Sequence, residues 1–340
     1  MKDVIIIAEA GVNHNGILDN ALSLIDCAAD AGADFIKFQT FKAEKIVSAK
    51  AKKADYQIKN LSDEFDTQFQ MLKSLEIPVD WYEKLLTRCD QKNIKFLSTG
   101  FDEESIDFLE NIGIPFFKIP SGEITNKPYL RHVAKKGKKV VISTGMANID
   151  EIRRAVQIFR QEGFGYDSIM VLHCNTEYPT PMHDVNLLAM NHIANELKLE
   201  VGYSDHTLGI EVSIAAVALG ARLIEKHFTL DRNMLGPDHK ASLEPNELKQ
   251  MVRAIRNIQL AIGGSSIKEP SPSEIKNISA ARKSIHISMD LASGHILKAC
   301  DLISLRPGNG ISPMDIDNIV GKMLVKDLSE GSMLTNNDFK

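Results

Sequence analysis

The feature that most constrains the fold is an alternation of short β-rich runs with longer stretches of helical periodicity. Eight runs are typical of strands: residues 4–8, 35–38, 95–97, 116–119, 139–142, 168–172, 200–202 and 223–225. Between them, apolar residues recur every three or four positions, as in LDNALSLIDCAADAGA (18–33) and IDEIRRAVQIFRQEG (149–163). This alternation predicts βα units around a parallel sheet.

Two architectures accommodate eight βα units in about 260 residues: a closed (β/α)8 barrel and an open, doubly wound sheet. The polar residues distinguish them, because every predicted strand has polar side chains at or just after its C-terminal end, such as Glu9, Lys37, Lys118 or His227. A barrel brings all of its C-terminal strand ends to one mouth, whereas an open sheet brings only the strands beside its switch point together. We therefore expect an α/β fold with a (β/α)8 TIM barrel.

A change of composition marks the end of the barrel. The stretch GGSSIKEPSPSE (263–274) is rich in Gly, Ser and Pro and is typical of a linker. After it, the short β-like pieces SIHIS, LISL and KMLV alternate with turn signals. We expect a catalytic barrel at 1–262, a linker at 263–280 and a small β-rich domain at 281–340. A domain of about 60 residues is near the lower limit for independent stability.

The composition excludes several classes of protein. With 44% hydrophobic and 25% charged residues and a net charge of -5, the chain is typical of a globular protein without a basic face for nucleic acid. It has no run of about 18 apolar residues, and its first apolar run lacks a cleavage pattern. Cys27, Cys89, Cys174 and Cys300 form no CxxC pair, so no disulfide framework is indicated. We expect a cytoplasmic protein with neither nucleic acid nor membrane as partner.

Two histidines predict a metal site. His206 and His227 follow the seventh and eighth predicted strands, which are neighbours in a barrel. Their imidazoles can converge on one divalent ion, with water and substrate oxygens completing its shell. Mixed nitrogen and oxygen ligation without thiolate suits Mn²⁺ or a similar metal. A single histidine is more commonly a hydrogen-bonded core residue, but two on adjacent strand ends favour the metal.

Two lysines predict an anion site. Lys37 and Lys118 follow apolar runs and should point into the barrel mouth, where a lysine without an anion is costly to bury. The side chains that can donate hydrogen bonds to a phosphate or carboxylate there are Ser98, Thr99, Ser121, Ser143, Ser204 and Asn175. A single serine is more commonly a turn or N-cap residue, so only the convergence of the set supports this interpretation.

Three carboxylates have two interpretations. Glu9, Glu123 and Asp238 are candidates for binding sugar hydroxyls or moving protons, because a closed mouth can tune a carboxyl pKa to either role. A salt bridge to Lys37 or Lys118 is an equally good explanation, and the residues alone leave both open.

Two other features receive structural interpretations. The motif GVNHNG (11–16) lacks the spacing of a dinucleotide or Walker loop and is interpreted as a βα turn. Cys174 has no evident general base beside it, so a catalytic thiol is not predicted.

Nine motifs carry a resemblance to a known family. They occur in the order AEAGVNHNG, KFQTFKA, KIPSGEI, ISTGMA, LHCNTEYPTP, GYSDHT, EKHFTLD, GPDHKASLEP and LRPGNGIS. This set resembles the bacterial sialic acid synthase family over nearly the whole chain. The resemblance implies a barrel joined to a C-terminal antifreeze-like (SAF) domain. It also implies a domain-swapped homodimer in which each small domain covers the barrel of its partner.

The resemblance also implies roles for individual residues. It assigns the metal to His206 and His227. It assigns phosphoenolpyruvate to Lys37, Thr99, Lys118, Ser121, Ser143, Asn175 and Ser204. It assigns the sugar to Gln39, Glu123, Tyr178 and Asp238, with Arg306 reaching in from the other subunit. Glu9 matches the acid on the family's first strand, and it or Glu123 would move protons. Family members usually read STPF at 98–101, and Gly100 frees a backbone that proline would fix.

The activity implied is a Mn²⁺-dependent condensation of phosphoenolpyruvate with N-acetylmannosamine, giving N-acetylneuraminate and phosphate. Motifs such as GEITN and VGYSDHTLGIEVSIAAVALGA are at least as similar to legionaminic acid synthases, which accept 2,4-diacetamido-2,4,6-trideoxymannose. That sugar needs a roomier and more apolar pocket, so the sequence leaves both substrates open. Two other classes remain as alternatives: a noncatalytic carbohydrate- or ice-binding protein, and an aldolase that uses free pyruvate.

Overall fold

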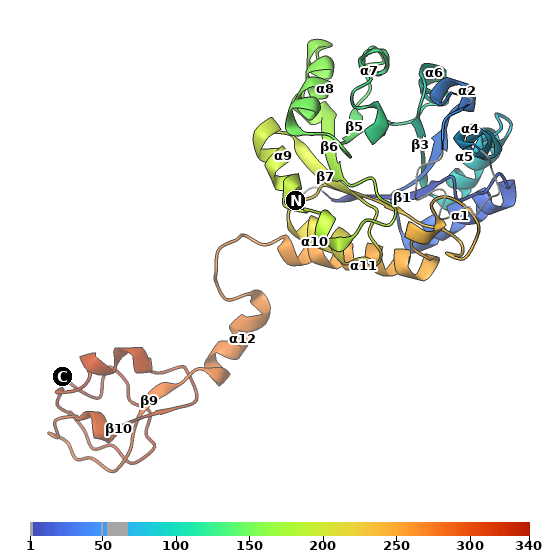
Figure 1. The fold of residues 1–340 in the computed structure, drawn as a ribbon. Helices are drawn as coiled ribbons and strands as arrows, with labels where there is room; N and C mark the ends of the chain where they lie inside the picture. Colours follow the sequence, from blue (N-terminus) through green and yellow to red (C-terminus); the bar gives the residue numbers. More distant parts are fainter. Residues whose placement is uncertain (1–2, 49, 53–66) are drawn as a thin grey trace. The chain divides into compact units, whose positions relative to one another are not determined.

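The structure is a computed structural model that describes residues 3–48, 50–52 and 67–340. The chain forms two compact units (Figure 1). The larger unit ends at Gly264, and the smaller unit runs from Ser265 to Lys340. Among the described residues, no helix combines the length and the apolar character needed to cross a bilayer. The cellular location expected from the sequence stays a prediction.

The larger unit is built on a closed barrel of parallel strands. They are β1 (Ile5–Gly11), β2 (Phe35–Thr40), β3 (Lys95–Gly100), β4 (Phe117–Ile119), β5 (Val140–Ser143), β6 (Ile169–Cys174), β7 (Glu200–Asp205) and β8 (Leu223–His227). The strands follow one another in chain order, and β8 pairs with β1 to close the barrel. The predicted (β/α)8 fold is confirmed.

Most of the strands extend further at their C-terminal ends than the sequence pattern predicts. Strand β1 ends at Gly11 instead of Ala8, and β8 ends at His227 instead of Glu225. Strands β2, β3, β6 and β7 are also two to three residues longer there. Hydrophobicity stops before these positions, but the polar side chains find partners inside the barrel, so strand pairing continues. The polar residues at the barrel mouth therefore lie on rigid backbone.

Helices surround the barrel (Figure 1). They are α1 (Leu18–Ala31), α2 (Ala43–Ile46), α4 (Gln68–Leu75), α5 (Trp81–Lys92), α6 (Glu103–Asn111), α7 (Lys127–Ala134), α8 (Ile149–Gln161), α9 (Ala189–Leu197), α10 (Glu211–Ala218) and α11 (Pro245–Ile262). Helix α8 shows how the sequence specifies them: Asn148 and Glu151 form a capping box at its start. Ile152, Val156 and Phe159 recur at helical spacing and are buried.

The smaller unit has its own core. Strands β9 (Ser284–Ile287) and β10 (Leu302–Leu305) pair in antiparallel fashion. Ile285, Ile287, Leu297, Leu324 and Leu334 form a buried cluster beside them. The piece KMLV (322–325) belongs to no named strand and contributes isolated bridges instead.

The segment predicted as a linker contains a helix. Helix α12 (Pro272–Ala281) lies largely inside residues 263–280. Ser271 and Glu274 form a capping box at its start, and Pro272 occupies the first turn, where proline is tolerated. The Ser- and Pro-rich composition that indicated a linker is therefore also the start signal of a helix.

Candidate active site

Two buried lysines lie inside the barrel at its C-terminal end. Lys37 Nζ lies 2.8 Å from Glu9 Oε2 and donates to Thr99 Oγ1 at 2.7 Å. Lys118 Nζ donates to Ser143 Oγ at 2.7 Å. All five residues are 2% to 4% exposed. Strands β1 to β5 thus each contribute one polar side chain to these two clusters.

A buried carboxylate that the sequence analysis missed lies between the two lysines. Glu225 Oε1 accepts from Ser204 Oγ at 3.2 Å and lies 3.5 Å from Lys118 Nζ. Its Oε2 lies 3.7 Å from Lys37 Nζ. Glu225 precedes His227 by two positions, and side chains two apart on a strand share a face, so alternation could have revealed it. We call the following set the lysine cradle: Glu9, Lys37, Thr99, Lys118, Ser143, Ser204 and Glu225.

Burial and charge set the protonation of the lysine cradle. Burial raises the pKa of Glu9 to about 7, although Lys37 opposes the change. Burial would also raise the pKa of Glu225, but the charges of Lys118 and Lys37 outweigh it and hold that pKa below its ordinary value. Burial lowers the pKa of Lys118, whereas the charges of Glu225 and Glu9 overcome burial and raise the pKa of Lys37. Glu9 can therefore hold or release a proton near neutral pH.

The two predicted histidines are neighbours. The ring centroids of His206 and His227 are 5.4 Å apart. His206 Nδ1 lies 2.5 Å from the carbonyl oxygen of Asn175. His227 Nδ1 is buried without a hydrogen-bond partner, and Asp238 Oδ2 lies 3.9 Å from it. Burial lowers the pKa of His206 to about 4 and that of His227 well below its ordinary range. Both rings are therefore neutral at neutral pH.

These two rings fit a divalent metal ion. Neutral imidazoles offer free lone pairs, and the backbone bond to His206 Nδ1 would leave Nε2 available to a metal, an arrangement common in metal-binding histidines. His227 Nδ1 is a buried nitrogen that lacks a partner. Within the described residues, no group of three His, Cys, Asp or Glu side chains could hold a metal. Other ligands would have to come from water or substrate, as in catalytic sites.

A glycine lies where the histidines and the lysine cradle meet. Gly11 has a φ of 53°, and a Cβ atom there would lie 3.3 Å from side-chain atoms of Gln39, Glu9 and His227. Gln39 Nε2 lies 3.5 Å from Glu9 Oε1. Glycine is required at position 11 for both its backbone angle and this close approach. The lysine cradle and the histidine pair are thus parts of one site.

Two further predicted residues lie beside this site. The Tyr178 ring is 4.2 Å from the His206 ring and 5.8 Å from the His227 ring, measured between centroids. Ser121 Oγ accepts from the backbone N–H of Gly145 at 3.0 Å and lies 3.2 Å from Cys174 Sγ. The Ser121 hydroxyl therefore connects the loops that follow β4 and β5 to the end of β6.

Three other predicted residues have different partners. Glu123 Oε2 accepts from the Asn126 amide at 2.6 Å and lines a separate pocket of about 380 Å³. Asn175 Oδ1 accepts from the backbone N–H of Glu177 at 2.8 Å, which is a turn within its own loop. Arg306 belongs to the smaller unit, where its Nε donates to the Ala281 carbonyl at 3.1 Å. Of the three carboxylates considered for a lysine salt bridge, Glu9 makes one.

Gly100 does not disturb the orientation of Thr99, the residue before it. The Thr99 hydroxyl is fixed by Lys37, and the carbonyl oxygen of Gly100 accepts from the Tyr129 hydroxyl at 2.5 Å. A Cβ atom at position 100 would lie 2.8 Å from Ile106 Cδ1. The packing of α6 against β3 therefore explains a small residue here.

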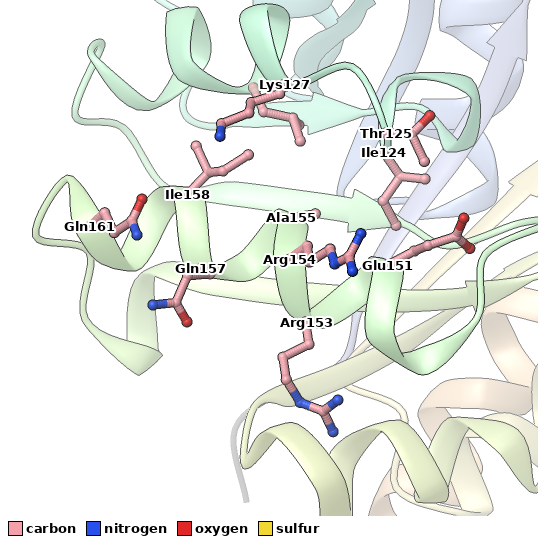
Figure 2. A pocket seen from close by; sticks show the side chains of 11 residues that line it. Ile124, Thr125, Lys127, Glu151, Arg153, Arg154, Ala155, Gln157, Ile158 and Gln161 are labelled. Carbon is pink, nitrogen blue, oxygen red and sulfur yellow. The ribbon is translucent and has the colours of Figure 1, made fainter.

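A groove larger than the pocket beside Glu123 lies elsewhere on the barrel unit. It measures about 630 Å³ and runs between α7 and α8 on the outside of the barrel (Figure 2). Its lining includes Leu130, Arg153, Arg154 and Ile158, and it contains no member of the lysine cradle or the histidine pair. This groove is therefore distinct from the barrel mouth, which the convergence of buried ionisable groups indicates as the active site.

Comparison with known proteins identifies the family. Residues 24–267 match the NeuB family, and residues 282–340 match the SAF domain. The chain belongs to the NeuB family. The N,N'-diacetyllegionaminic acid synthase of Campylobacter jejuni is 52% identical over 98% of this chain and 99% of the relative. The enzyme of the same name from Legionella pneumophila is 48% identical over 97% of this chain and 92% of the relative.

A solved structure supports the same assignment. The N-acetylneuraminic acid (sialic acid) synthetase of Leptospira borgpetersenii, crystallised with citrate, has a TM-score of 0.70 and 36% identity to this NeuB-family chain. The match covers 82% of this chain and 91% of that one. The resemblance found in the nine motifs is therefore confirmed, and so is the prediction of an enzyme.

Proposed function

We propose that this chain is an N,N'-diacetyllegionaminic acid synthase, which condenses phosphoenolpyruvate with 2,4-diacetamido-2,4,6-trideoxymannose and releases phosphate. The observation that carries the proposal is the lysine cradle beside two neutral histidines at the barrel mouth. The choice of sugar is supported by the two relatives of that name, at 52% and 48% identity. N-acetylmannosamine, the first expectation from the sequence, becomes the alternative.

The lysine cradle would bind the two anionic groups of phosphoenolpyruvate. Lys37 with Thr99, and Lys118 with Ser143, present ammonium and hydroxyl donors within one buried space. With Glu9 protonated, two lysines face the single charge of Glu225, and the cradle carries one net positive charge. A pKa of about 7 for Glu9 makes this state accessible near neutral pH. An arriving anion would therefore meet a complementary charge.

The reaction forms a bond between C3 of phosphoenolpyruvate and the aldehyde carbon of the open-chain sugar. Water adds at C2, and the C–O bond to phosphate then breaks. Lys37 and Lys118 would stabilise the charge that collects on the departing phosphate. Glu9 would hold the proton that moves between water and product. By resemblance, the sugar contacts fall to Gln39, Glu123, Tyr178 and Asp238.

We propose Mn²⁺ or a similar ion at His206 and His227. When bound, it would supply Lewis-acid polarisation of the sugar aldehyde. Metal-free protein should take up Mn²⁺ in calorimetry, and His227→Ala should bind it much more weakly while its circular dichroism is unchanged. Chelation should abolish turnover, and Mn²⁺ should restore it. Full activity in excess chelator would contradict the metal assignment.

The deciding experiment measures phosphate release from phosphoenolpyruvate with each sugar alone and with both in competition. We expect the higher kcat/KM with the diacetamido sugar and no release without a sugar. A preference for N-acetylmannosamine would make the enzyme a sialic acid synthase instead. Condensation of free pyruvate without phosphate would indicate an aldolase. Absence of phosphate release with every N-acylated hexose tested would favour a noncatalytic binding protein.

We further propose that Arg306 acts at the barrel of a second copy in a homodimer, as the resemblance implies. Co-expression of His227→Ala chains with Arg306→Ala chains tests this, because a mixed dimer would contain one site with both defects and one intact site. Random pairing should restore about a quarter of wild-type activity. Hybrid dimers that are confirmed by mass but are no more active than their parents would contradict the arrangement.

A further inference from the structure

The motif GVNHNG, interpreted from the sequence as a turn, also has side chains that form hydrogen bonds with another loop. It follows β1, and its side chains reach the loop of residues 229–243 that follows β8. Asn13 Nδ2 donates to the carbonyl oxygen of Phe228 at 2.8 Å and to Ser242 Oγ at 2.9 Å. Asn13 is 0% exposed and Ser242 is 1% exposed, so water does not compete for these bonds.

A second crossing runs through a buried histidine. Asn15 Oδ1 lies 3.0 Å from His239 Nε2, and His239 Nδ1 lies 2.7 Å from Thr229 Oγ1. Asn15 Nδ2 donates to the carbonyl oxygen of Leu235 at 2.8 Å. Burial lowers the pKa of His239 to about 4, so the ring is neutral. In the tautomer that bonds both neighbours, Nε2–H donates to Asn15 and Nδ1 accepts from the Thr229 hydroxyl, whose proton then favours this contact at 2.7 Å over the Asp231 carbonyl at 3.1 Å.

These crossings fix the backbone that carries Asp238. Ser242 Oγ, which accepts from Asn13, donates to the carbonyl oxygen of Asp238 at 2.7 Å. His239, the next residue, bonds Asn15. The Asp238 carboxyl oxygen Oδ2 lies 3.9 Å from His227 Nδ1. The bonds to Ser242 and His239 therefore restrict the backbone that places the Asp238 carboxyl beside the histidine pair.

The motif itself is anchored by packing against α5. His14 is fully buried, and its ring packs edge-on against Trp81 of α5, with centroids 6.0 Å apart and an interplanar angle of 75°. His14 Nδ1 accepts from the backbone N–H of Gly16 at 3.0 Å. The side that faces the β8 loop is therefore presented by a rigid turn.

We propose that Asn13 and Asn15 are positioning residues. Together with Thr229, His239 and Ser242 they form what we call the amide clamp, which aims Asp238 at the sugar without touching it. Asparagine suits this role because its amide donates and accepts without charge, so both loops are joined with no ion to bury. The effect on turnover rests on the sugar contact proposed for Asp238, whereas the effect on the loop does not.

The first test compares Asn15→Ala with Asn233→Ala. Asn233 is exposed on the same loop, and its amide bonds the nearby Asp231, so it is a matched control. Asn15→Ala should lower kcat/KM for the sugar about 10-fold and leave KM for phosphoenolpyruvate within about twofold, because it misplaces one contact group. His239→Gln, whose amide can still donate to Asn15, should retain more activity than His239→Ala.

The second comparison asks whether Asn15 acts through Asp238. In an Asp238→Ala background, Asn15→Ala should cost less than about a further twofold, because the group that it positions is already gone. An equal loss in both backgrounds would overturn the proposal and indicate a general structural role.

A third measurement does not depend on activity. The backbone N–H of Ala241 donates to Asp238 O, and that of Ser242 donates to His239 O. Asn15→Ala should speed hydrogen exchange at these amides, and Asn233→Ala should not. Unchanged exchange in Asn15→Ala would overturn the amide clamp. If the wild-type enzyme released no phosphate, the proposed function would fail, and exchange would still decide on the clamp.

Discussion

Strands β7 and β8 carry ionic networks on opposite sides, one inside the barrel and one outside. The outer network centres on Lys226, whose Nζ lies 3.0 Å from Asp205 Oδ2 and donates to the Thr207 carbonyl at 2.5 Å. Asp205 also accepts from the backbone N–H and hydroxyl of Thr207 and from Ser213 Oγ on α10. Lys226 and Asp205 are both 0% exposed.

The two networks differ in how completely their polar atoms are satisfied. Each carboxylate oxygen of Asp205 has two partners. In the lysine cradle, Glu225 Oε2 is buried without a hydrogen bond and has only a long ion pair, at 3.7 Å from Lys37 Nζ. Completed buried networks fix one structure, whereas unpaired buried groups call for a ligand or another explanation. The same kinds of residue are thus fully satisfied on one side of the strands and incompletely satisfied on the other.

The largest expected effect is on the outer side. Lys226→Met should lower the free energy of unfolding by about 3–5 kcal/mol, because it leaves the Asp205 charge buried and unpaired. Urea unfolding followed by circular dichroism measures this change. The double variant Asp205→Asn with Lys226→Met removes both charges and should recover part of the loss. If Lys226→Met were as stable as the wild type, the outer network would not be the one that stabilises the fold.

A substitution on the inner side should reduce activity more than stability. Lys118→Met should lower kcat/KM for phosphoenolpyruvate roughly 10- to 100-fold, because a hydrogen bond to a charged group contributes about 1.5–3 kcal/mol. Stability should fall less than in Lys226→Met, since Glu225 keeps Lys37 as a neighbour. Steady-state kinetics with each substrate varied in turn separates the two constants. A change confined to the KM of the sugar would mean that the lysine cradle is not the anion site.

The smallest effect is a pH dependence of stability. The folded-state pKa of Glu9 is raised from 4.5 to about 7, so the folded protein favours its protonated form. Its stabilising contribution is present below about pH 4.5 and is lost as the pH rises through about 7. In metal-free protein, the stability of wild type relative to Glu9→Gln should therefore fall across this range. Exposed Glu83→Gln serves as control, and parallel curves for Glu9→Gln and wild type would refute the shift.

Much of the fold could be predicted because its signals are local. The alternation of strand and helix patterns gave the barrel, and the rule that barrel sites lie at strand ends located Lys37, Lys118, His206 and His227. The strand boundaries were less accurate, because hydrophobicity ends where the site begins. Glu225 was missed for this reason: the predicted strand ended at it, so its alternation with His227 along one continuous strand was overlooked.

What could not be predicted is which partners the loop side chains find, because some of these partners are local and others are distant. Asn175 Oδ1 closes a turn in its own loop, and donation to the anion by its Nδ2 stays a prediction. Glu123 bonds a neighbouring amide instead of a lysine. The bond between Asn15 and His239 joins residues 224 positions apart. Side-chain direction in such loops follows from the folded backbone, which single-sequence patterns do not specify.

Three consecutive ionisable residues end the strand that closes the barrel: Glu225 and His227 face inward, and Lys226 faces outward. A slip of β8 by one residue would exchange the two sides. The lysine would enter the barrel beside Lys37 and Lys118, and Glu225 or His227 would replace it beside the buried Asp205 carboxylate. A wrongly closed barrel would carry buried, uncompensated charges and could not compete with the correct one. The alternation of ionisable residues along β8 therefore also selects its correct register when the barrel closes.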